Sequence, residues 1–405
     1  MLEFLGSALS YILPFLAVLT LVVTVHELGH FWAARACGVA VDRFSIGFGK
    51  AILSWTDRKG VEWTVGWLPL GGYVRFAEDE SASTSIPDRN TLEMLRADIR
   101  RREGPGAERR YFHFKPVWQR AFIVAAGPLA NFLLAIVLFS GLVAARGEMV
   151  LPPRIDAVAW FSPAEQAGFR KGDTIIEADG KKIDNFADIF EIVMFNAAVP
   201  LDFVVERDGR EVRIRATPQR VERTDPTGVS QKMGYLGLQP PPFSEATRRG
   251  FGPLEAVGNG AERTWDVVAT TGKYLGRLVM GRESPEQLSG PLRIAHASGS
   301  VASAGADTGV SFGQKAVGVA TNLIFLAGIL SVGIGLMNLL PVPVLDGGHL
   351  VFYAYEAAAR RPVGAGVQAA SYRVGLVLLL GLMVFATWND LNQLRVFQYL
   401  GGLFS

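Results

Sequence analysis

The sequence is poor in cysteine, in histidine and in charge. Its single cysteine, Cys37, cannot form an internal disulfide, so each domain must be held together by its packed core. Charged residues make up 19% of the chain and the net charge is only +2, which excludes the overall basic character of a nucleic-acid-binding protein. Apolar residues, in contrast, make up 49%, and the mean hydropathy is +0.25. This balance indicates a membrane protein.

Four apolar segments are long enough to cross the hydrocarbon layer, which takes about 20 helical residues. They run approximately from Leu5 to Trp32, Phe122 to Val143, Val317 to Leu340 and Val367 to Trp388. No basic region precedes the first apolar stretch, so we expect this segment to be retained rather than cleaved as a signal peptide.

Basic residues cluster in two of the connections between these segments. Arginine and lysine are frequent between the first and second segments, and Arg360, Arg361 and Arg373 follow the third. The positive-inside rule makes both connections cytoplasmic, and it places both termini and residues 146–314 outside. We therefore expect a multi-pass protein of the cell (inner) membrane, surrounded by the lipid bilayer.

The outer region begins with a compact module that we assign to residues 146–222. Asp208-Gly209 lies between two runs of alternating apolar residues, which predicts a β-hairpin, and Asp179-Gly180 predicts a second turn. The stretch from Ser162 to Asp173 resembles PDZ domains of the bacterial protease type. Ser162 fits a helix N-cap and Gly168 a helix end. We expect an inserted α+β PDZ domain.

The remaining segments are less informative. Apolar residues recur at helical spacing from Pro253 to Arg282, which predicts an amphipathic helix lying on the membrane surface or packing on the module. Ser81 to Arg110 is interpreted as a solvated loop around a short helix, Thr91 to Arg101. The predicted domains are thus residues 1–145 and 315–405 in the membrane, the module at 146–222, and a linker region at 223–314.

The strongest chemical signal is His26-Glu27-Leu28-Gly29-His30, at the inner end of the first apolar helix. Histidines four residues apart share one helix face and can bind one Zn²⁺, while Glu27 is placed to take a proton from an attacking water. Ionisable groups at membrane depth cost about 2.5 kcal/mol or more each and persist mainly for function. We therefore predict a zinc site near the cytoplasmic side of the membrane.

A catalytic zinc needs a third protein ligand. The candidates are Cys37, Glu62, His113, Asp346 and His349. Ala36 occupies the third-ligand position of the longer metzincin motif, and Cys37 lies too far along the first helix. Asp346 is favoured, because prolines and glycines break the helix around it, from Asn338 to His349. Irregular backbone at membrane depth must be buried in protein or line a polar cavity.

Together these motifs resemble the site-2 protease family, specifically its bacterial RseP-like branch, which cleaves anti-sigma factors. The shared patterns are His-Glu-Leu-Gly-His in a first membrane helix and Asn-x-x-Pro-x-Pro-x-Leu-Asp-Gly-Gly in a later one. The likeness extends to Leu68–Val74, Phe114–Arg120, Ala126–Phe132, the PDZ module, Leu288–Pro291 and Phe385–Leu391. Some members of this branch carry tandem PDZ modules whereas this chain has one, so a double-gate arrangement is not carried over.

The resemblance implies an intramembrane zinc endopeptidase that performs regulated intramembrane proteolysis. Its expected substrates are single-pass membrane proteins such as trimmed anti-sigma factors, and also signal-peptide remnants. The zinc ligands would be His26, His30 and Asp346, with Glu27 as the base. Substrate capture is implied near Asn338, Pro341 and Pro343.

A membrane protease must also unwind a helical substrate and replace its backbone hydrogen bonds. Residues from Glu62 to Leu68 and from Tyr73 to Phe76 are predicted to pair as a re-entrant hairpin closed around Pro69 to Gly72. Its edge would pair with the extended substrate. The predicted contact residues are Leu70, Gly71, Gly72 and Tyr73.

Two alternatives and one open question remain. A membrane metal carrier or transporter would need neither Glu27 nor a PDZ module, and the intact Glu27 argues against an inactive PDZ scaffold. The PDZ module either captures a new carboxyl terminus or excludes substrates that keep a folded ectodomain. Exclusion is favoured, because the region around Pro152 to Ile155 lacks a glycine-rich carboxylate loop.

Overall fold

A computed structural model describes residues 2–77, 89–224, 230–280, 290–307 and 311–393. The chain divides into two compact units, which are described separately. The first comprises the described residues of Met1–Gly141, Val257–Gly276 and Ser289–Asp390, and the second those of Leu142–Ala256, Arg277–Leu288 and Leu391–Ser405.

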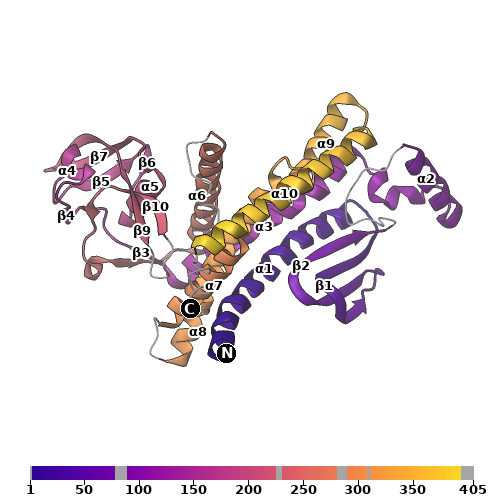
Figure 1. Cartoon of the computed structure of the whole chain (residues 1–405), viewed down its shortest axis with the longest axis horizontal. Coiled ribbons are helices and arrows are strands. Elements are labelled where there is room, and N and C mark those ends of the chain that lie inside the picture. Colours follow the sequence, from indigo (N-terminus) through magenta and orange to yellow (C-terminus); the bar gives the residue numbers. More distant parts are fainter. Residues whose placement is uncertain (1, 78–88, 225–229, 281–289, 308–310, 394–405) are drawn as a thin grey trace, which may run out of the picture. The chain divides into compact units, whose positions relative to one another are not determined.

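The first unit is built on four long apolar helices (Figure 1): α1 (Leu2–Ala36), α3 (Val117–Arg146), α8 (Phe312–Leu339) and α10 (Ala365–Gln393). Each contains a stretch long and apolar enough to cross a membrane: Tyr11–Ala36, Val117–Arg146, Phe312–Leu339 and Ala365–Asn392. The predicted spanning segments are therefore confirmed as helices of sufficient length. Outward-facing side chains such as Val137 and Val377 are apolar and well exposed, as lipid contact requires.

Close packing holds α1 against α3 and α8. Val18 and Val22 of α1 are buried together with Ala327 of α8. A Cβ atom added at Gly29 would lie 2.3 Å from the carbonyl oxygen of Ala126 in α3, so the two backbones approach too closely for any larger residue. The face of α1 that carries both histidines of the motif is thereby pressed against α3.

Shorter helices complete this unit. They are α6 (Pro253–Val279), α7 (Pro291–Asp307) and α9 (Asp346–Ala359). The predicted helix is confirmed as α6. Its Gly260 packs on α3, where an added Cβ would lie 2.1 Å from Ser140 Oγ, a contact that neither expected placement included. The sequence analysis did not predict α7, whose first turn is capped by the fully buried Asp390: its Oδ1 accepts from Gly290 N (2.9 Å) and its Oδ2 from Arg293 N (3.0 Å).

A β-sheet lies beside α1 (Figure 1), formed by β1 (Val41–Thr56) and β2 (Glu62–Phe76). Both strands bend, so the sheet has four segments in the order 51–56, 62–66, 41–46 and 72–76. The two outer pairs are antiparallel, whereas the register of 43–46 with 62–65 runs parallel. The predicted pairing of Glu62–Leu68 with Tyr73–Phe76 is therefore wrong. Both segments pair with residues 41–46, which lie between them, and Pro69 to Gly72 form a bend within β2 instead of a hairpin turn.

The described part of the predicted cytoplasmic loop is folded rather than solvated throughout. It contains α2 (Arg89–Glu103) and the short helices η1 (Ala107–Arg110) and η2 (Phe112–Phe114). Phe112 stacks on Phe76 of β2 with ring centroids 5.0 Å apart, and Ala40 N donates to Arg110 O (2.8 Å). This segment thus packs on the sheet and on the end of α1. Residues 81–88 of the predicted loop lie outside the described residues.

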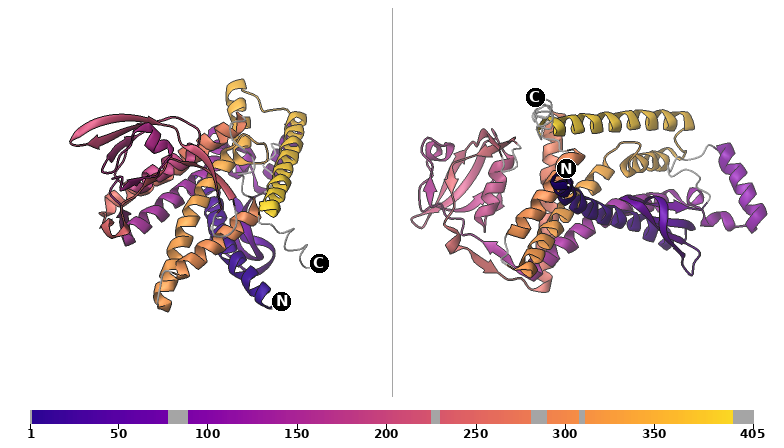
Figure 2. Two further views of the ribbon diagram at one scale, coloured as in Figure 1. Left: turned by 60° about the vertical axis from the view of Figure 1, so that its left-hand side comes forward. Right: turned by 60° about the horizontal axis from the view of Figure 1, so that its bottom comes forward.

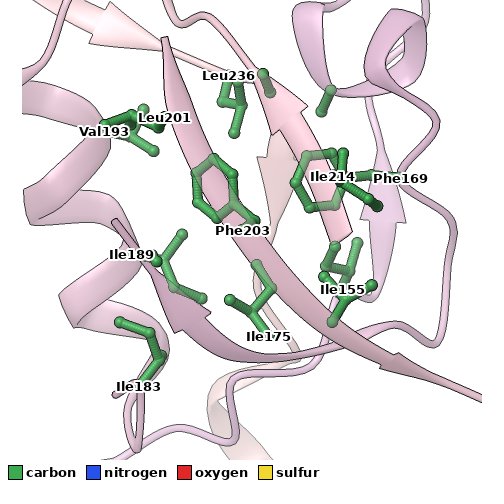
Figure 3. Packing of buried hydrophobic residues seen from close by; sticks show 14 of the residues in the cluster. Ile155, Phe169, Ile175, Ile183, Ile189, Val193, Leu201, Phe203, Ile214 and Leu236 are labelled. Carbon is green, nitrogen blue, oxygen red and sulfur yellow. The ribbon is translucent and has the colours of Figure 1, made fainter. Parts of the chain in front are cut away.

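The second unit contains the predicted α+β module, with α4 (Pro163–Ala167), α5 (Phe186–Phe195) and η3 (Phe243–Glu245). Its strands are β3 (Glu148–Val150), β4 (Ala157–Val158), β5 (Thr174–Ala178), β6 (Lys181–Lys182), β7 (Leu201–Arg207), β8 (Arg210–Ala216), β9 (Gln219–Thr224), β10 (Ser230–Tyr235), β11 (Leu238–Gln239) and β12 (Thr247–Arg249). Four of them form a sheet in the order β6-β5-β7-β8. Figure 3 shows its apolar core, in which Ile175, Phe203 and Ile189 are almost fully buried.

Local sequence signals in this module are confirmed. β7 and β8 form a hairpin across Asp208-Gly209, and β5 and β6 meet at Asp179-Gly180. Ser162 Oγ accepts from Glu165 N at the start of α4, and Gly168 ends this helix at φ 91. The module extends beyond the expected boundary at residue 222, because β11 pairs with β4 and β12 pairs with β3. These short strands carry no alternation long enough to be recognised in sequence.

Candidate active site

The two histidines of the motif converge on one point. His26 and His30 lie one helical turn apart on α1, and their Nε2 atoms are 3.1 Å from each other. The His26 side chain is almost fully buried, and that of His30 is 13% exposed. Both imidazoles therefore present one ring nitrogen to the same small, water-poor volume.

Asp346 joins them from the other half of the chain. Its Oδ2 lies 3.1 Å from His26 Nε2 and 3.4 Å from His30 Nε2. The helix break after α8 makes this approach possible, because Asp346 is the first residue of α9. Gly347 and Gly348 follow at positions where an added Cβ would lie 2.3 Å from the carbonyl oxygens of Leu339 and Val342, so only glycine fits this fold-back.

The other proposed third ligands lie apart from this point. Among the described residues, His26, His30 and Asp346 are the group of three whose ligand atoms lie within 4.8 Å of one another. Cys37 carries a free thiol, and Glu62 forms an ion pair with Arg43 (2.6 Å). The ring of His349 lies beside Tyr372 of α10. Figure 2 shows how the chain turns back between α9 and α10.

The convergent atoms fit a bound cation. His30 Nδ1 lies 2.9 Å from the carbonyl oxygen of Ile123, which can only accept, so Nδ1 carries the proton and Nε2 presents a lone pair. Asp346 Oδ2 is buried and makes no hydrogen bond of satisfactory geometry with a described residue, although both imidazoles are close. Two nitrogens and one carboxylate oxygen are a common ligand set for catalytic zinc. The residues present therefore fit zinc.

Glu27 lies between the three candidate ligands and the sheet. Its side chain faces the backbone of Val74, and its Cγ would lie 3.6 Å from a Cβ added at Gly72. The same face of α1 holds β2 at two further positions: Thr20 Oγ1 donates to Pro69 O (2.6 Å), and Val23 lies against Gly71. One face of α1 therefore contacts α3, and another carries Glu27 along the edge of the sheet.

Helix α3 forms a wall behind the histidines that the sequence analysis did not assign. Ile123, Gly127 and Asn131 lie four residues apart on this helix. A Cβ added at Gly127 would lie 2.3 Å from His30 Nε2, and Asn131 Nδ2 lies 3.3 Å from His26 Nδ1. The segment Ala126–Phe132 was noticed as part of the family pattern, but a glycine and an amide carry no chemical signature that identifies them as neighbours of a zinc site.

A buried ion pair holds the helix that begins with Asp346. Arg120 of α3 donates to Glu356 of α9 (2.7 Å), and its guanidinium lies 5.0 Å from the ring centroid of Tyr353. Both partners of the ion pair are largely buried. Removing either side chain would leave the charge of the other buried and unpaired, which is strongly destabilising. The ion pair therefore fixes α9 relative to α3 and supports the placement of Asp346.

The predicted substrate-binding residues fall in two places. Asn338 donates to Ile334 O within α8 (3.1 Å), and Pro341 and Pro343 line a cavity of about 570 Å³. Val342 lines it beside the two prolines, and α10 lines its other side through Gly366, Val367, Ala370, Ser371, Val374, Gly375 and Leu378. Leu70, Gly71, Gly72 and Tyr73 lie on β2. Gly72 lies next to Glu27, whereas Leu70 is exposed and Tyr73 stacks on Phe48.

Comparisons with known proteins place the chain in a family. It matches the model of peptidase family M50 over residues 14–382. The protein named Metalloprotease MmpA of Caulobacter vibrioides is 50% identical over 397 residues, covering 98% of this chain and 99% of that protein. The protein named Putative zinc metalloprotease Atu1380 of Agrobacterium fabrum is 42% identical over 390 residues, covering 96% and 97%.

A solved PDZ domain of an SdrC-like protein from Listeria monocytogenes covers 23% of this chain and 88% of that chain, with 13% identity and a TM-score of 0.18. The family model extends from the helix with the His-Glu-x-x-His motif to α10, and so includes both halves of the candidate metal site. The chain therefore belongs to peptidase family M50 and is a membrane zinc metalloprotease of the site-2 type.

Proposed function

We propose that this protein is an intramembrane endopeptidase that cuts single-pass membrane proteins within their apolar segments. The observation that carries the proposal is the convergence of His26, His30 and Asp346 beside Glu27, on helices of membrane-spanning length. The family membership supports the enzyme class and sets aside the metal carrier and the inactive scaffold. We propose that its physiological substrates are trimmed membrane proteins of the anti-sigma-factor kind, which the enzyme cuts by regulated intramembrane proteolysis.

The proposed division of labour follows from the geometry. His26, His30 and Asp346 would hold Zn²⁺, which when bound acts as a Lewis acid on the scissile carbonyl. Glu27 accepts the proton of the attacking water and then passes it to the leaving amine. Its position beside the backbone of Val74 puts this proton transfer at the edge of the sheet.

The edge formed by residues 72–76 is proposed to hold the substrate. This segment pairs on one side with residues 41–46, and on the described sheet no further segment pairs with its other side. An unwound substrate strand added at this edge would regain backbone hydrogen bonds next to Glu27. Asn338, Pro341 and Pro343, with the cavity beside α10, are proposed to bind the substrate on the opposite side of the site.

The test uses the purified full-length protein in liposomes with a single-pass substrate whose ectodomain has been trimmed. We expect fragments with new ends inside the apolar segment, identified by mass spectrometry. Fragments with ends only outside that segment, or none at all from zinc-loaded protein, would contradict intramembrane cleavage.

The proposed orientation places the active site near the cytoplasmic side of the membrane and the PDZ module outside the cell's inner membrane. A reporter inserted at Gly104, two residues beyond Arg102, is expected to report a cytoplasmic position, because the arginines of α2 favour that side. Gly104 lies just after α2, and an added Cβ there would meet no atom within 4 Å, so the position faces open space. A reporter fused after Ser405 should report an extracytoplasmic position, and the opposite pattern would reverse the topology.

The PDZ module is proposed to control access of substrates. The structure adds one observation that the sequence analysis missed: Gly237, at φ 92, forms a turn between the buried Leu236 and β11, beside β4. A glycine turn therefore lies next to the edge of the module, supplied by its last strands instead of the region around Pro152 to Ile155. Size exclusion and carboxylate capture both remain to be separated by experiment.

Excision of the module separates them. Val150 and Thr247 are paired across β3 and β12, so a two-residue Asn-Gly turn can join them in place of residues 151–246. If the module excludes by size, the shortened protein should cut a substrate with a folded ectodomain as well as the trimmed one. Loss of cleavage of the trimmed substrate, in protein that still binds zinc, would instead assign capture of the carboxyl terminus.

A further inference from the structure

The two histidines turn their second ring nitrogens towards α3. Because both Nε2 atoms face Asp346, each Nδ1 points away from the place where the three ligand atoms converge. His30 Nδ1 meets the carbonyl oxygen of Ile123 at 2.9 Å. This oxygen can only accept, so it fixes the proton of His30 on Nδ1 and leaves Nε2 free for a metal.

His26 needs the same arrangement, and the group that faces its Nδ1 is the amide of Asn131. Asn131 is 0% exposed, and its Nδ2 lies 3.3 Å from His26 Nδ1. Its Oδ1 is buried without a hydrogen-bond partner among the residues that the structure describes. A buried amide oxygen left without a donor costs about 1–3 kcal/mol.

With Nδ2 as the donor, Nδ1 of His26 would be the acceptor and the imidazole proton would lie on Nε2. That nitrogen is 3.1 Å from Asp346 Oδ2, at the point where a ligand lone pair is required. A half-turn of the amide about its Cβ–Cγ bond exchanges Oδ1 with Nδ2 and preserves its shape. Oδ1 then accepts from Nδ1–H, which resolves both the unpartnered oxygen and the wrong tautomer.

We propose that Asn131 is a positioning residue for the zinc site: its Oδ1 accepts from Nδ1–H of His26 and so keeps Nε2 available to the metal. This inference rests on the proposed zinc ligation by His26. Histidines that ligate metals almost always donate their second N–H to a carbonyl or carboxylate, and loss of that partner lowers metal affinity or activity about 10- to 100-fold. Since Ile123 contributes its backbone, Asn131 is the partner that can be changed by substitution.

The test measures zinc affinity of the full-length protein in detergent, by competition with a chromogenic chelator. Asn131→Leu keeps the size of the side chain but removes the acceptor, and should lower zinc affinity about 10- to 100-fold. Asn131→Asp keeps an acceptor at the same place and should restore affinity close to that of the wild type. Peptidase activity at limiting zinc should follow the same order.

Two reference variants make the result decisive. Ser331→Ala removes the hydrogen bond to the backbone oxygen of Asn131 (2.8 Å) but leaves the amide in place, so zinc affinity should not change even if stability falls. His26→Ala should lose zinc, and retention there would refute the ligand assignment itself. If Asn131→Leu binds zinc as the wild type does, or if Asn131→Asp is as weak as Asn131→Leu, the positioning role is overturned.

Discussion

Glu27→Gln is expected to abolish cleavage while the protein keeps its zinc. Glutamine has nearly the same shape as glutamate, so the helix contact with Gly72 and the three ligand side chains are undisturbed. What is lost is the group that accepts the proton of the attacking water, and removing an oriented proton-transfer group costs roughly 10²- to 10⁴-fold in rate. Turnover of a transmembrane substrate and zinc content by atomic absorption are measured on the same preparation.

Asp346→Asn provides the contrast to that variant. It is also a change from carboxylate to amide, but at a ligand position, where a neutral amide is a poor replacement for an anion. Zinc content should fall together with activity. Full activity of Glu27→Gln would refute its role as the base, and stoichiometric zinc in Asp346→Asn would mean that another residue is the third ligand.

The sequence identifies the chemistry of this site better than its surroundings. His26, Glu27, His30 and Asp346 lie together as expected. They could be recognised in the sequence because an ionisable side chain at membrane depth needs a functional reason. Asp346 could be predicted as a ligand although it is far from His30 in sequence, because the broken helix before it indicated a functional site. Their roles are proposals that the two variants above test.

Other features could not be predicted because they depend on neighbours that are distant in the chain. The sequence around Pro69 to Gly72 suggested a hairpin turn between its two neighbouring segments. The actual partner of both segments is residues 41–46, which lie before a bend at Gly47 and Gly49. The role of Gly127 is visible only once α3 is placed against α1. A glycine that makes room for an imidazole has no pattern of its own in the sequence.

Gly127→Ala is therefore expected to destroy the metal site although it adds only one methyl group. The new Cβ would lie 2.3 Å from His30 Nε2 and 2.9 Å from His26 Cε1. Helix α3 cannot retreat easily, because α8 lies against it: Ser331 Oγ donates to Asn131 O (2.8 Å), and a Cβ added at Gly328 would lie 2.5 Å from the Phe139 ring. The imidazoles must turn away instead, and a displacement of about 1 Å at a catalytic group can cost about 100-fold in rate. Zinc content and turnover should both fall.

Gly141→Ala is the matched control on the same helix. A Cβ added at Gly141 meets no atom within 4 Å, and alanine in a helix interior is favoured over glycine by roughly 0.5–1 kcal/mol. This variant should keep its zinc and its activity, with a thermal midpoint equal to or slightly above that of the wild type. Because the two substitutions change helix propensity in the same direction, a loss confined to Gly127→Ala must come from the space that the methyl group takes from the histidines. Zinc-loaded, active Gly127→Ala protein would show that α3 does not form the wall of the metal site.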